Sequence, residues 1–499
     1  MKNQKGSQTA LSVIWMIQVV AEAVTAFMLW RLDMLPMKYL AVLLAVFVLG
    51  AVVTRVMMFR KVGKWQKKAF QPKRVLGCAL SVIVIALCAA AIYAVFKLNV
   101  TFSSITGNKT VNAVVGVYVL ADDPAEDIGD VADYSFAVMD TYDAEDVQKA
   151  VAEIEEKLGT VLAVADYDTT FAMVDALYAR EVGALVLSES YIDILEGIDA
   201  YADFSEKTKM LHMEVIEKKG NDDEQSSAAV DDPTEAPFLL YISGNDARRE
   251  LLADGGSDVN ILVAVNPRDK QILMVNTPRD YFVPNPAGNG AKDKLSHCGL
   301  YGIDCSVQAL SDLYGQPISY YAKINFAGFK TLVDALGGVT IYSDVAFTAG
   351  DTYIREGENQ LNGTQALAFA RERKNLPGGD NDRGKNQMKL ISAMINQLSA
   401  GNLLANYGDI LSSLEGMFAT NMTTDTISAL VKMQLSDMAS WDILSLAVTG
   451  DNGNDAPYAL GGLYAYVMYP HEDEVAHASS LIGRVLDGEV LAEADLAMN

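Results

Sequence analysis

The chain has 499 residues, of which 51% are apolar and 21% charged, so it is long enough for two or three domains and too apolar to be disordered. Its net charge of −25 argues against nucleic-acid binding as the main function. The charge is uneven: residues 1–100 hold 13 Lys and Arg against two acidic residues, a net +11, and the remainder holds 26 against 62, a net −36. The four cysteines and four histidines show no zinc-binding spacing.

Three apolar runs open the chain, each about 20 residues long, which suits a bilayer core roughly 30 Å thick. They are Leu11–Trp30, Tyr39–Met58 and Val75–Phe96. A cleaved signal peptide would not be followed by two further runs, so we interpret residues 1–100 as three membrane spans. The loop between the second and third runs is rich in Lys and Arg. The positive-inside rule therefore predicts that this loop and the N-terminus are cytoplasmic, and that the rest of the chain lies outside the cell.

The pattern over residues 101–217 predicts a small accessory α/β domain outside the membrane. Short β-rich runs alternate with helical ones, and the clearest are a strand at Val114–Leu120 and helices at Ala144–Leu158 and Thr170–Tyr178. No catalytic spacing occurs in it. The polar residues 218–236, with Gly, Ser and Pro, are typical of a linker.

The pattern of apolar and polar residues over 237–499 predicts a second outer domain of the α/β class. Its core is expected over 238–400 and its C-terminal part over 401–490. The expected strands are Phe238–Ile242, Asn260–Val265, Ile272–Asn276, Tyr320–Ile324, Val339–Tyr342, Trp441–Val448 and Leu463–Met468. The expected helices are Phe326–Leu336, Leu361–Arg371 and Lys385–Leu398. Gly337-Gly338 gives the first of these helices a left-handed C-terminal cap.

Polar side chains stand at the ends of the expected strands. Asp246 follows the first strand, Asp258 precedes the second, and Arg279 follows the third. If these strands pair, the three side chains converge at one edge of the sheet. Two carboxylates there suit Mg²⁺, which takes one or two carboxylates together with phosphate and water oxygens. Taken alone, each aspartate is more typical of a turn or a helix cap.

A second cluster lies between two expected helices. Arg371 and Arg373 stand near the end of one helix, and Arg383 and Gln387 share a face at the start of the next. The acidic residues from Asp380 on are suited to capping that second helix. Arginine forks bind phosphate oxygens bidentately, so the cluster favours a phosphate site. Any one of these arginines is more typical of a surface ion pair.

The segment around Lys294 contains further residues with two possible interpretations. Lys294 either reaches a phosphate or is a solvated loop lysine, and His297 either donates to the same site or is structural. Cys298 and Cys305 are seven residues apart outside the predicted membrane spans, so they are either free thiols or a loop-closing disulfide.

Taken together, these pieces resemble the LytR-CpsA-Psr family of cell-envelope proteins. The likeness runs from Phe238 to Gln397 and more weakly through Trp441–Gly488. Three leading spans with an accessory outer domain are similar to the capsule-associated branch. The matching pieces, in order, are Asp246 with Arg248, Ser257-Asp258, Thr277-Pro278-Arg279-Asp280, the Lys294 segment, Asn325-Phe326-Ala327-Gly328-Phe329, Gly337-Gly338-Val339, Leu361-Asn362-Gly363, Arg371 with Arg373, and Asp380 with Arg383 and Gln387.

The resemblance implies an α-β-α sandwich with a central mixed sheet and a Mg²⁺-dependent phosphotransferase. Such an enzyme moves a glycopolymer from undecaprenyl pyrophosphate to a hydroxyl of peptidoglycan and releases undecaprenyl phosphate. The polymer is a teichoic acid, a capsular polysaccharide or another wall polysaccharide, and the sequence does not distinguish them. Two other functions stay open: a hydrolase of the same donor, and a non-enzymatic membrane regulator that binds polyprenyl phosphates.

The resemblance also implies a role for each motif residue. Asp246 and Asp258 would hold Mg²⁺, Phe326 and Phe329 would meet the prenyl tail, and Asp380 is the candidate base. The implied pyrophosphate ligands are Arg248, Arg279, Lys294, Arg371, Arg373, Arg383 and Gln387. The sequence departs from the family pattern at Asn386, where the family often has Arg, and at Thr277, where Ser is usual.

Overall fold

The computed structural model describes residues 2–59, 72–106, 111–139, 144–218, 230–245, 255–398, 410 and 417–498. The chain forms two compact units, and each is described by itself. One unit contains Met1–Ser104 and Thr423–Ala439, and the other contains Ile105–Asn406 and Ser440–Asn499. Most of the predicted linker lies outside the described residues.

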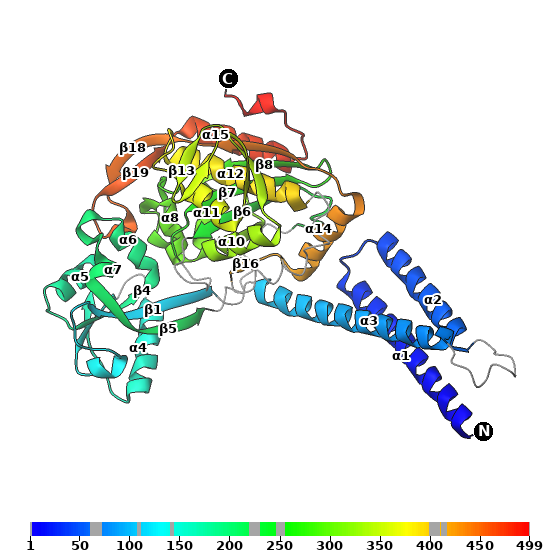
Figure 1. Ribbon diagram of the computed structural model, residues 1–499. Helices are drawn as coiled ribbons and strands as arrows, with labels where there is room; N and C mark the ends of the chain where they lie inside the picture. Colours follow the sequence, from blue (N-terminus) through cyan, green and yellow to red (C-terminus); the bar gives the residue numbers. More distant parts are fainter. Residues whose placement is uncertain are drawn as a thin grey trace. The chain divides into compact units, whose positions relative to one another are not determined.

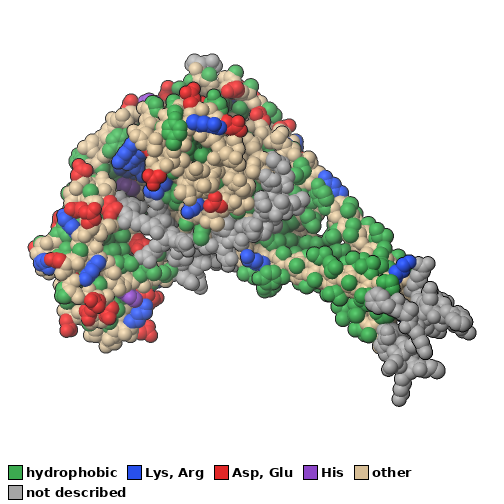
Figure 2. Space-filling model, in the orientation of Figure 1, with side chains coloured by type: hydrophobic (Ala, Val, Ile, Leu, Met, Phe, Trp, Pro, Cys, Tyr) green, Lys and Arg blue, Asp and Glu red, His purple; other side chains and the backbone are tan. Residues whose placement is uncertain are grey.

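The first unit is built on three long helices, α1 (Lys2–Leu32), α2 (Met37–Phe59) and α3 (Pro72–Ile105) (Figure 1). Each contains a stretch that is long and apolar enough to cross a membrane, which agrees with the three predicted spans. Figure 2 shows apolar side chains over most of the visible surface of these helices. Helix α14 (Thr424–Asp437) belongs to the same unit, and its Lys432 pairs with Asp33 at 2.7 Å.

Gln18, a polar side chain inside the first span, has partners on both neighbouring helices. Gln18 donates from Nε2 to Glu22 Oε1 at 2.8 Å and accepts from Thr54 Oγ1 of α2 at 3.0 Å and from Ser81 Oγ of α3 at 2.5 Å. An unpaired amide or carboxyl group would be costly in a lipid environment, so this network explains how Gln18 and Glu22 are tolerated.

The accessory region of the second unit is a five-stranded sheet covered on both faces. Its strands are β1 (Val111–Leu120), β2 (Ser135–Met139), β3 (Ala163–Tyr167), β4 (Ala184–Ser188) and β5 (Thr208–Lys218), in the order β3-β2-β4-β1-β5. The amphipathic helix α4 (Ala144–Leu158) packs on one face through Val147, Ala150 and Ile154. The other face is covered by α5 (Thr170–Tyr178), α6 (Ile192–Glu196) and α7 (Phe204–Lys207). The predicted helices at 144–158 and 170–178 are therefore confirmed.

The larger region is an α-β-α sandwich around a six-stranded mixed sheet, as the resemblance implies. Its strands are β6 (Phe238–Asn245), β7 (Val259–Asn266), β8 (Gln271–Asn276), β11 (Tyr320–Asn325), β16 (Phe418–Thr420) and β17 (Asp442–Ala447), in the order β16-β11-β6-β7-β8-β17. The β11–β6 and β8–β17 pairs are parallel, and the other neighbours are antiparallel.

Helices cover both faces of this sheet. Helices α9 (Ile303–Tyr314) and α15 (Glu472–Leu486) bury Leu310 and Ile482 against Leu262 and Leu273 of the strands. Helix α12 (Asp380–Gln397) contacts β7, β8 and β17. Helices α10 (Phe326–Ala335) and α11 (Gly363–Arg371) pack on each other over a second core with the short pairs β12–β15 and β13–β14. The short strands are Val339–Ser343 (β12), Phe347–Ala349 (β13), Thr352–Ile354 (β14) and Gly357–Leu361 (β15).

Two predicted helix starts are wrong, for local reasons. The helix expected from Leu361 starts at Gly363, because Leu361 ends β15 and Asn362 forms a capping box with Gln365. The helix expected from Lys385 starts at Asp380, because Gly379, with φ of 57°, forms its N-cap. Asp380 and Asp382 therefore lie in the first turn instead of capping the helix, where their charges still favour its positive end.

Strand register brings the predicted strand-end residues to one edge of the sheet. Gly244 of β6 pairs with Val259 of β7, and Ile261 pairs with Asn276 of β8. Asp258 before β7 and Arg279 after β8 therefore lie at the same edge, as predicted, whereas Asp246 lies outside the described residues. The loop before β7 is held from outside the sheet by α8 (Leu295–Cys298), because Ser257 N donates to Ser296 O at 3.0 Å.

We expect Gly299→Ala to disturb this edge. A Cβ at Gly299 would lie 2.5 Å from Gly255 O and 3.2 Å from Ser257 N, and these backbone atoms yield only if the loop that carries Asp258 moves. Overpacking of this kind costs about 1–3 kcal/mol, so thermal unfolding should occur at a lower temperature.

Gly483→Ala in α15 is the matched control. Its nearest neighbour is the flexible end of Gln316, at 3.1 Å, and alanine is favoured over glycine inside a helix. A Gly299→Ala protein as stable as wild type would contradict the tight contact at the sheet edge.

Candidate functional site

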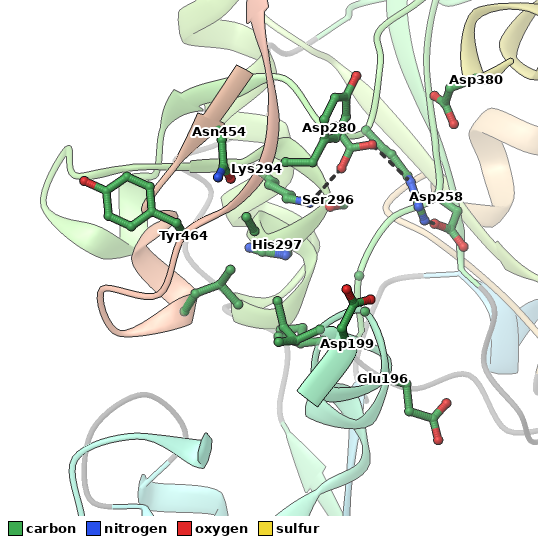
Figure 3. A pocket seen from close by; sticks show the side chains of 18 of the residues that line it. Glu196, Asp199, Asp258, Asp280, Lys294, Ser296, His297, Asp380, Asn454 and Tyr464 are labelled. Carbon is green, nitrogen blue, oxygen red and sulfur yellow. Dashed lines mark hydrogen bonds and ion pairs between the residues drawn. The ribbon is translucent and has the colours of Figure 1, made fainter. Parts of the chain in front are cut away.

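A cavity of about 1220 Å³ lies at this edge of the sheet. Three parts of the second unit line it: the strand-end loops, the start of α12, and residues 190–200 of the accessory region together with residues 454–466 (Figure 3). Five of the predicted site residues line the cavity, namely Asp258, Arg279, Lys294, Arg373 and Asp380. Residues far apart in the sequence therefore meet there, as the motif spacing predicts.

Backbone hydrogen bonds fix the positions of Asp258 and Arg279. Asp258 N donates to Gly244 O at 2.8 Å, so the residue continues the register of β7. Arg279 O accepts from Ser296 N at 2.9 Å, which ties the loop after β8 to α8. Beneath Asp258, a buried network joins Tyr241 to Asn260 and Ser257. The site is therefore supported by satisfied polar groups, which limit its movement.

Four side chains form a chain of alternating charges on the cavity wall. Arg279 Nη1 lies 2.5 Å from Asp258 Oδ1, and its Nε lies 3.6 Å from Asp280 Oδ2. Lys294 Nζ donates to Asp280 Oδ1 at 3.0 Å (Figure 3). Asp280 thus stands between the two cations. Both cations keep a defined position while remaining at the cavity surface.

Burial and charge act in opposite directions on these groups. Burial alone would raise the pKa of Asp280, but the charges of Lys294 and Arg279 outweigh it and lower that pKa. Burial alone would lower the pKa of Arg279, but the carboxylates of Asp258 and Asp280 raise it above its ordinary value. Both side chains are therefore charged at neutral pH.

Helix α12 brings a further pair to the same place. Arg383 Nη2 lies 2.6 Å from Asp380 Oδ1, and Arg383 is buried behind this cavity-lining carboxylate. Burial lowers the pKa of Arg383, and the positive charges of Arg279 and Arg373 act in the same direction, whereas Asp380 opposes them. Arg279, Arg373 and Arg383 are thus close enough to repel one another. An anion placed among them would relieve this repulsion.

Four other predicted residues do not line this cavity. Arg371 stacks over the ring of Phe326, with Cζ 4.9 Å from the ring centroid. Gln387 is buried and donates to Ala370 O of α11 at 3.2 Å. Phe329 packs against the second core between α10 and α11. Their phosphate and prenyl roles stay predictions.

Asp246 and Arg248 lie outside the described residues. Among the residues that the structure does describe, no group of three or more His, Cys, Asp or Glu side chains is placed to hold a metal ion. Asp258 suits Mg²⁺ as one carboxylate ligand, because this ion usually keeps water and phosphate oxygens as its other ligands.

His297 and the two cysteines have structural partners. His297 Nδ1 lies 2.6 Å from Asp293 Oδ1, and the buried Asp293 also accepts from Lys294 N and from Asn285 Nδ2. His297 nevertheless lines the cavity beside Lys294 (Figure 3). The cysteines, left open by the sequence, are buried free thiols, and Cys305 donates to Asn285 Oδ1 at 3.3 Å.

Several cavity residues were not predicted. Asp280 is the last residue of the Thr-Pro-Arg-Asp motif, so its position next to Arg279 in the sequence could have indicated that it belongs to the site. Glu196 and Asp199 of the accessory region, and Asn454 and Tyr466 of the late strands, carry no motif. Only the tertiary structure brings them to the site.

Comparisons with known proteins agree with the motif pattern. A model described as the LytR_cpsA_psr family matches residues 202–475. The polyisoprenyl-teichoic acid–peptidoglycan teichoic acid transferase TagU of Bacillus mycoides is 33% identical over 230 residues, covering 46% of this chain and 75% of its own. TagU of Bacillus anthracis is 34% identical over the same length and coverage. The crystal structure of Bacillus subtilis TagV is 25% identical, covers 52% of this chain and 99% of its own, and has a TM-score of 0.43.

The lowered pKa of Asp280 predicts how stability depends on pH. The folded-state pKa lies below the ordinary value of 3.8, so Asp280 stabilises the fold above about pH 3.8, and this contribution is lost as the pH falls through the lowered pKa. Removing one partner of a buried ion pair costs about 3 kcal/mol. Asp280→Asn should therefore lower the thermal unfolding temperature of the detergent-solubilised protein strongly at pH 7 and by less at pH 3.

Asp122→Asn serves as the control, since Asp122 is an exposed carboxylate paired with Arg180. It should change stability little at either pH. An Asp280→Asn effect of equal size at pH 7 and pH 3 would contradict the charge-based account.

Proposed function

This chain belongs to the LytR-CpsA-Psr family, and from that premise we propose that it transfers a glycopolymer from an undecaprenyl-pyrophosphate carrier to a hydroxyl of peptidoglycan, releasing undecaprenyl phosphate. One observation carries this proposal: Arg279, Lys294 and Arg373 line one cavity together with the carboxylates Asp258 and Asp380. This set of side chains suits a diphosphate. The names of the relatives favour a teichoic acid as the polymer.

The proposed reaction breaks the phosphoanhydride bond of the donor diphosphate and forms a phosphodiester bond to the acceptor. The acceptor oxygen attacks the phosphorus that carries the glycopolymer, and the bond from that phosphorus to the bridging oxygen of undecaprenyl phosphate breaks. The proton of the attacking hydroxyl leaves to a base, for which Asp380 is our candidate because it lines the cavity beside the arginines. Transfer of this kind depends mainly on in-line positioning and charge neutralisation.

The alternating charge chain supports the positioning part of this mechanism. Asp258 and Asp280 hold Arg279, and Asp280 also holds Lys294, so both cations are in place before a substrate binds. Cations that need no reorganisation stabilise the charge of a phosphoryl-transfer transition state more effectively than mobile ones. Arg373, which lines the cavity, would approach the same phosphate oxygens, and Arg383 would add its positive charge from behind Asp380.

Charge balance supports a role for Mg²⁺. Of the described side chains that line the cavity, five are carboxylates and four are lysines or arginines. A diphosphate would add further negative charge, so a divalent cation is needed to bring the complex near neutrality. We assign Asp258 as a ligand, with Asp246 as the second, and phosphate and water oxygens completing the coordination. The ion would supply charge neutralisation at the diphosphate.

We place the proposed reaction outside the cell. The three apolar helices suggest membrane anchoring, and the basic loop between the second and third predicts that the region after α3 is extracellular. No ATP is available there, so the bond energy has to arrive with the lipid-linked donor.

Arg279→Ala tests the proposal. We expect transfer of polymer from an undecaprenyl-pyrophosphate donor to peptidoglycan oligomers to fall by at least about 100-fold, because loss of one preorganised donor costs about 3 kcal/mol or more. Folding should persist, because the cavity wall retains its backbone hydrogen bonds.

Arg268→Ala is the matched control, since Arg268 is an exposed arginine whose partner is Glu235 at 3.7 Å. Full transfer by Arg279→Ala would overturn the proposed site. Release of polymer without dependence on peptidoglycan would instead identify a hydrolase.

Metal removal tests the proposed cofactor separately. We expect EDTA to abolish transfer and excess Mg²⁺ to restore it, while Asp258→Asn should require a higher Mg²⁺ concentration for half-maximal rate. Thermal unfolding of the protein with and without Mg²⁺ gives a second readout, because a bound ligand stabilises the folded state. Transfer that persists in EDTA would exclude the Mg²⁺ assignment.

A further inference from the structure

Part of the cavity wall has no assigned contact with the diphosphate in the mechanism described above. It comes from the antiparallel pair β18 (Gly450–Asp455) and β19 (Ala465–Pro470), and from Asp199 of the accessory region. Asn454 and Tyr466 are cross-strand partners in this hairpin, and both line the cavity. An aromatic ring, an amide and a carboxylate thus stand around the place proposed for a diphosphate.

Tyr466 is held beside the phosphate-binding cations. Its hydroxyl donates to Asn452 Oδ1 at 2.7 Å, and Lys294 Nζ lies 5.9 Å from its ring centroid. Burial raises the pKa of Tyr466, and the negative charges of Asp280 and Asp380 raise it further. The residue remains 46% exposed. A fixed aromatic ring with this much open surface, next to Lys294, is available to a ligand.

The hairpin connection is anchored at both ends of the cavity. Ala459 N donates to Asp293 Oδ2 at 3.1 Å, and Asp293 also accepts from the backbone of Lys294. The next residue, Leu460, is buried in the accessory core beside α5 and α6. One short segment therefore links the phosphate side of the cavity to the accessory wall that carries Asp199. Figure 3 shows the Asp199 carboxylate directed toward the strand-end residues.

We propose that Tyr466, Asn454 and Asp199 form a carbohydrate-binding subsite that holds a pyranose sugar next to the diphosphate. An aromatic ring offers an apolar face to the C–H groups of a pyranose, while the amide and the carboxylate exchange hydrogen bonds with its hydroxyl and acetamido groups. The inference rests on the proposed function, which places sugars on both sides of the reacting phosphorus. The bound sugar belongs either to the polymer of the donor or to the glycan of the acceptor.

Binding to the full chain in detergent micelles tests the subsite with three probes. The first is a short polyprenyl diphosphate that carries a disaccharide, and the second is the same lipid without sugar. The third is a tetrasaccharide of alternating N-acetylglucosamine and N-acetylmuramic acid. Titration calorimetry gives Kd for the wild type and for Tyr466→Ala, Tyr466→Phe and Asp199→Ala.

We expect Tyr466→Ala to weaken binding of one sugar-bearing probe about tenfold, which corresponds to about 1.4 kcal/mol. Tyr466→Phe keeps the ring and should restore wild-type Kd, and Asp199→Ala should weaken the same probe. Binding of the sugar-free lipid should stay within about twofold in every variant. A loss confined to the first probe identifies the donor sugar, and a loss confined to the tetrasaccharide identifies the acceptor.

Tyr469→Ala is the control for hairpin stability. Tyr469 lies on the same strand and donates to Asp455 Oδ2 at 2.9 Å, but it does not line the cavity. Equal losses in Tyr469→Ala and Tyr466→Ala, or wild-type binding of both sugar probes by Tyr466→Ala, would overturn the subsite. A wild-type protein that binds sugars through Tyr466 but transfers no polymer would support the subsite and refute the proposed transferase.

Discussion

The site depends on the position of one carboxylate, that of Asp280, between Lys294 and Arg279. Two cations brought to one cavity wall repel each other, and at a partly buried place water screens that repulsion weakly. Asp280 offsets it from inside the wall, because only 11% of its side chain is exposed. Lys294 and Arg279 can then face the same cavity in fixed positions.

This arrangement also explains why the cavity is not strongly positive. Asp258, Asp280 and Asp380 each hold an arginine or a lysine in place, and together with Glu196 and Asp199 they balance the cations of the wall. The ion pairs thus fix the positions of the cations, but they also reduce the net attraction of the cavity for anions. In the proposed reaction, a divalent cation would restore the attraction for a diphosphate.

The sequence predicts the part of the site that depends on local order. Asp258 and Arg279 could be brought together because strand ends have a fixed relation to sheet edges, and the structure confirms that register. The start of α12 was predicted wrongly because it depends on Gly379, which forms the N-cap with a positive φ. The periodicity of apolar residues gives no information on such a backbone conformation. The packing of Arg371 over Phe326 depends on how two helices lie together, and single-sequence patterns do not carry that information.

The accessory region, too, could be predicted only in part from the sequence. Its elements were predictable from periodicity, yet the place of Asp199 at the cavity depends on Leu460, a residue some 260 positions later, entering the accessory core. Because the same segment donates a hydrogen bond to Asp293 beside Lys294, displacement of the accessory wall would pull on the backbone of the proposed phosphate site. The accessory region is thus joined to the cavity by packing and by a hydrogen bond as well as by the chain itself. Under the proposed function, such a wall would contact the ligand directly, whereas a loosely tethered domain would only raise the local concentration of a ligand.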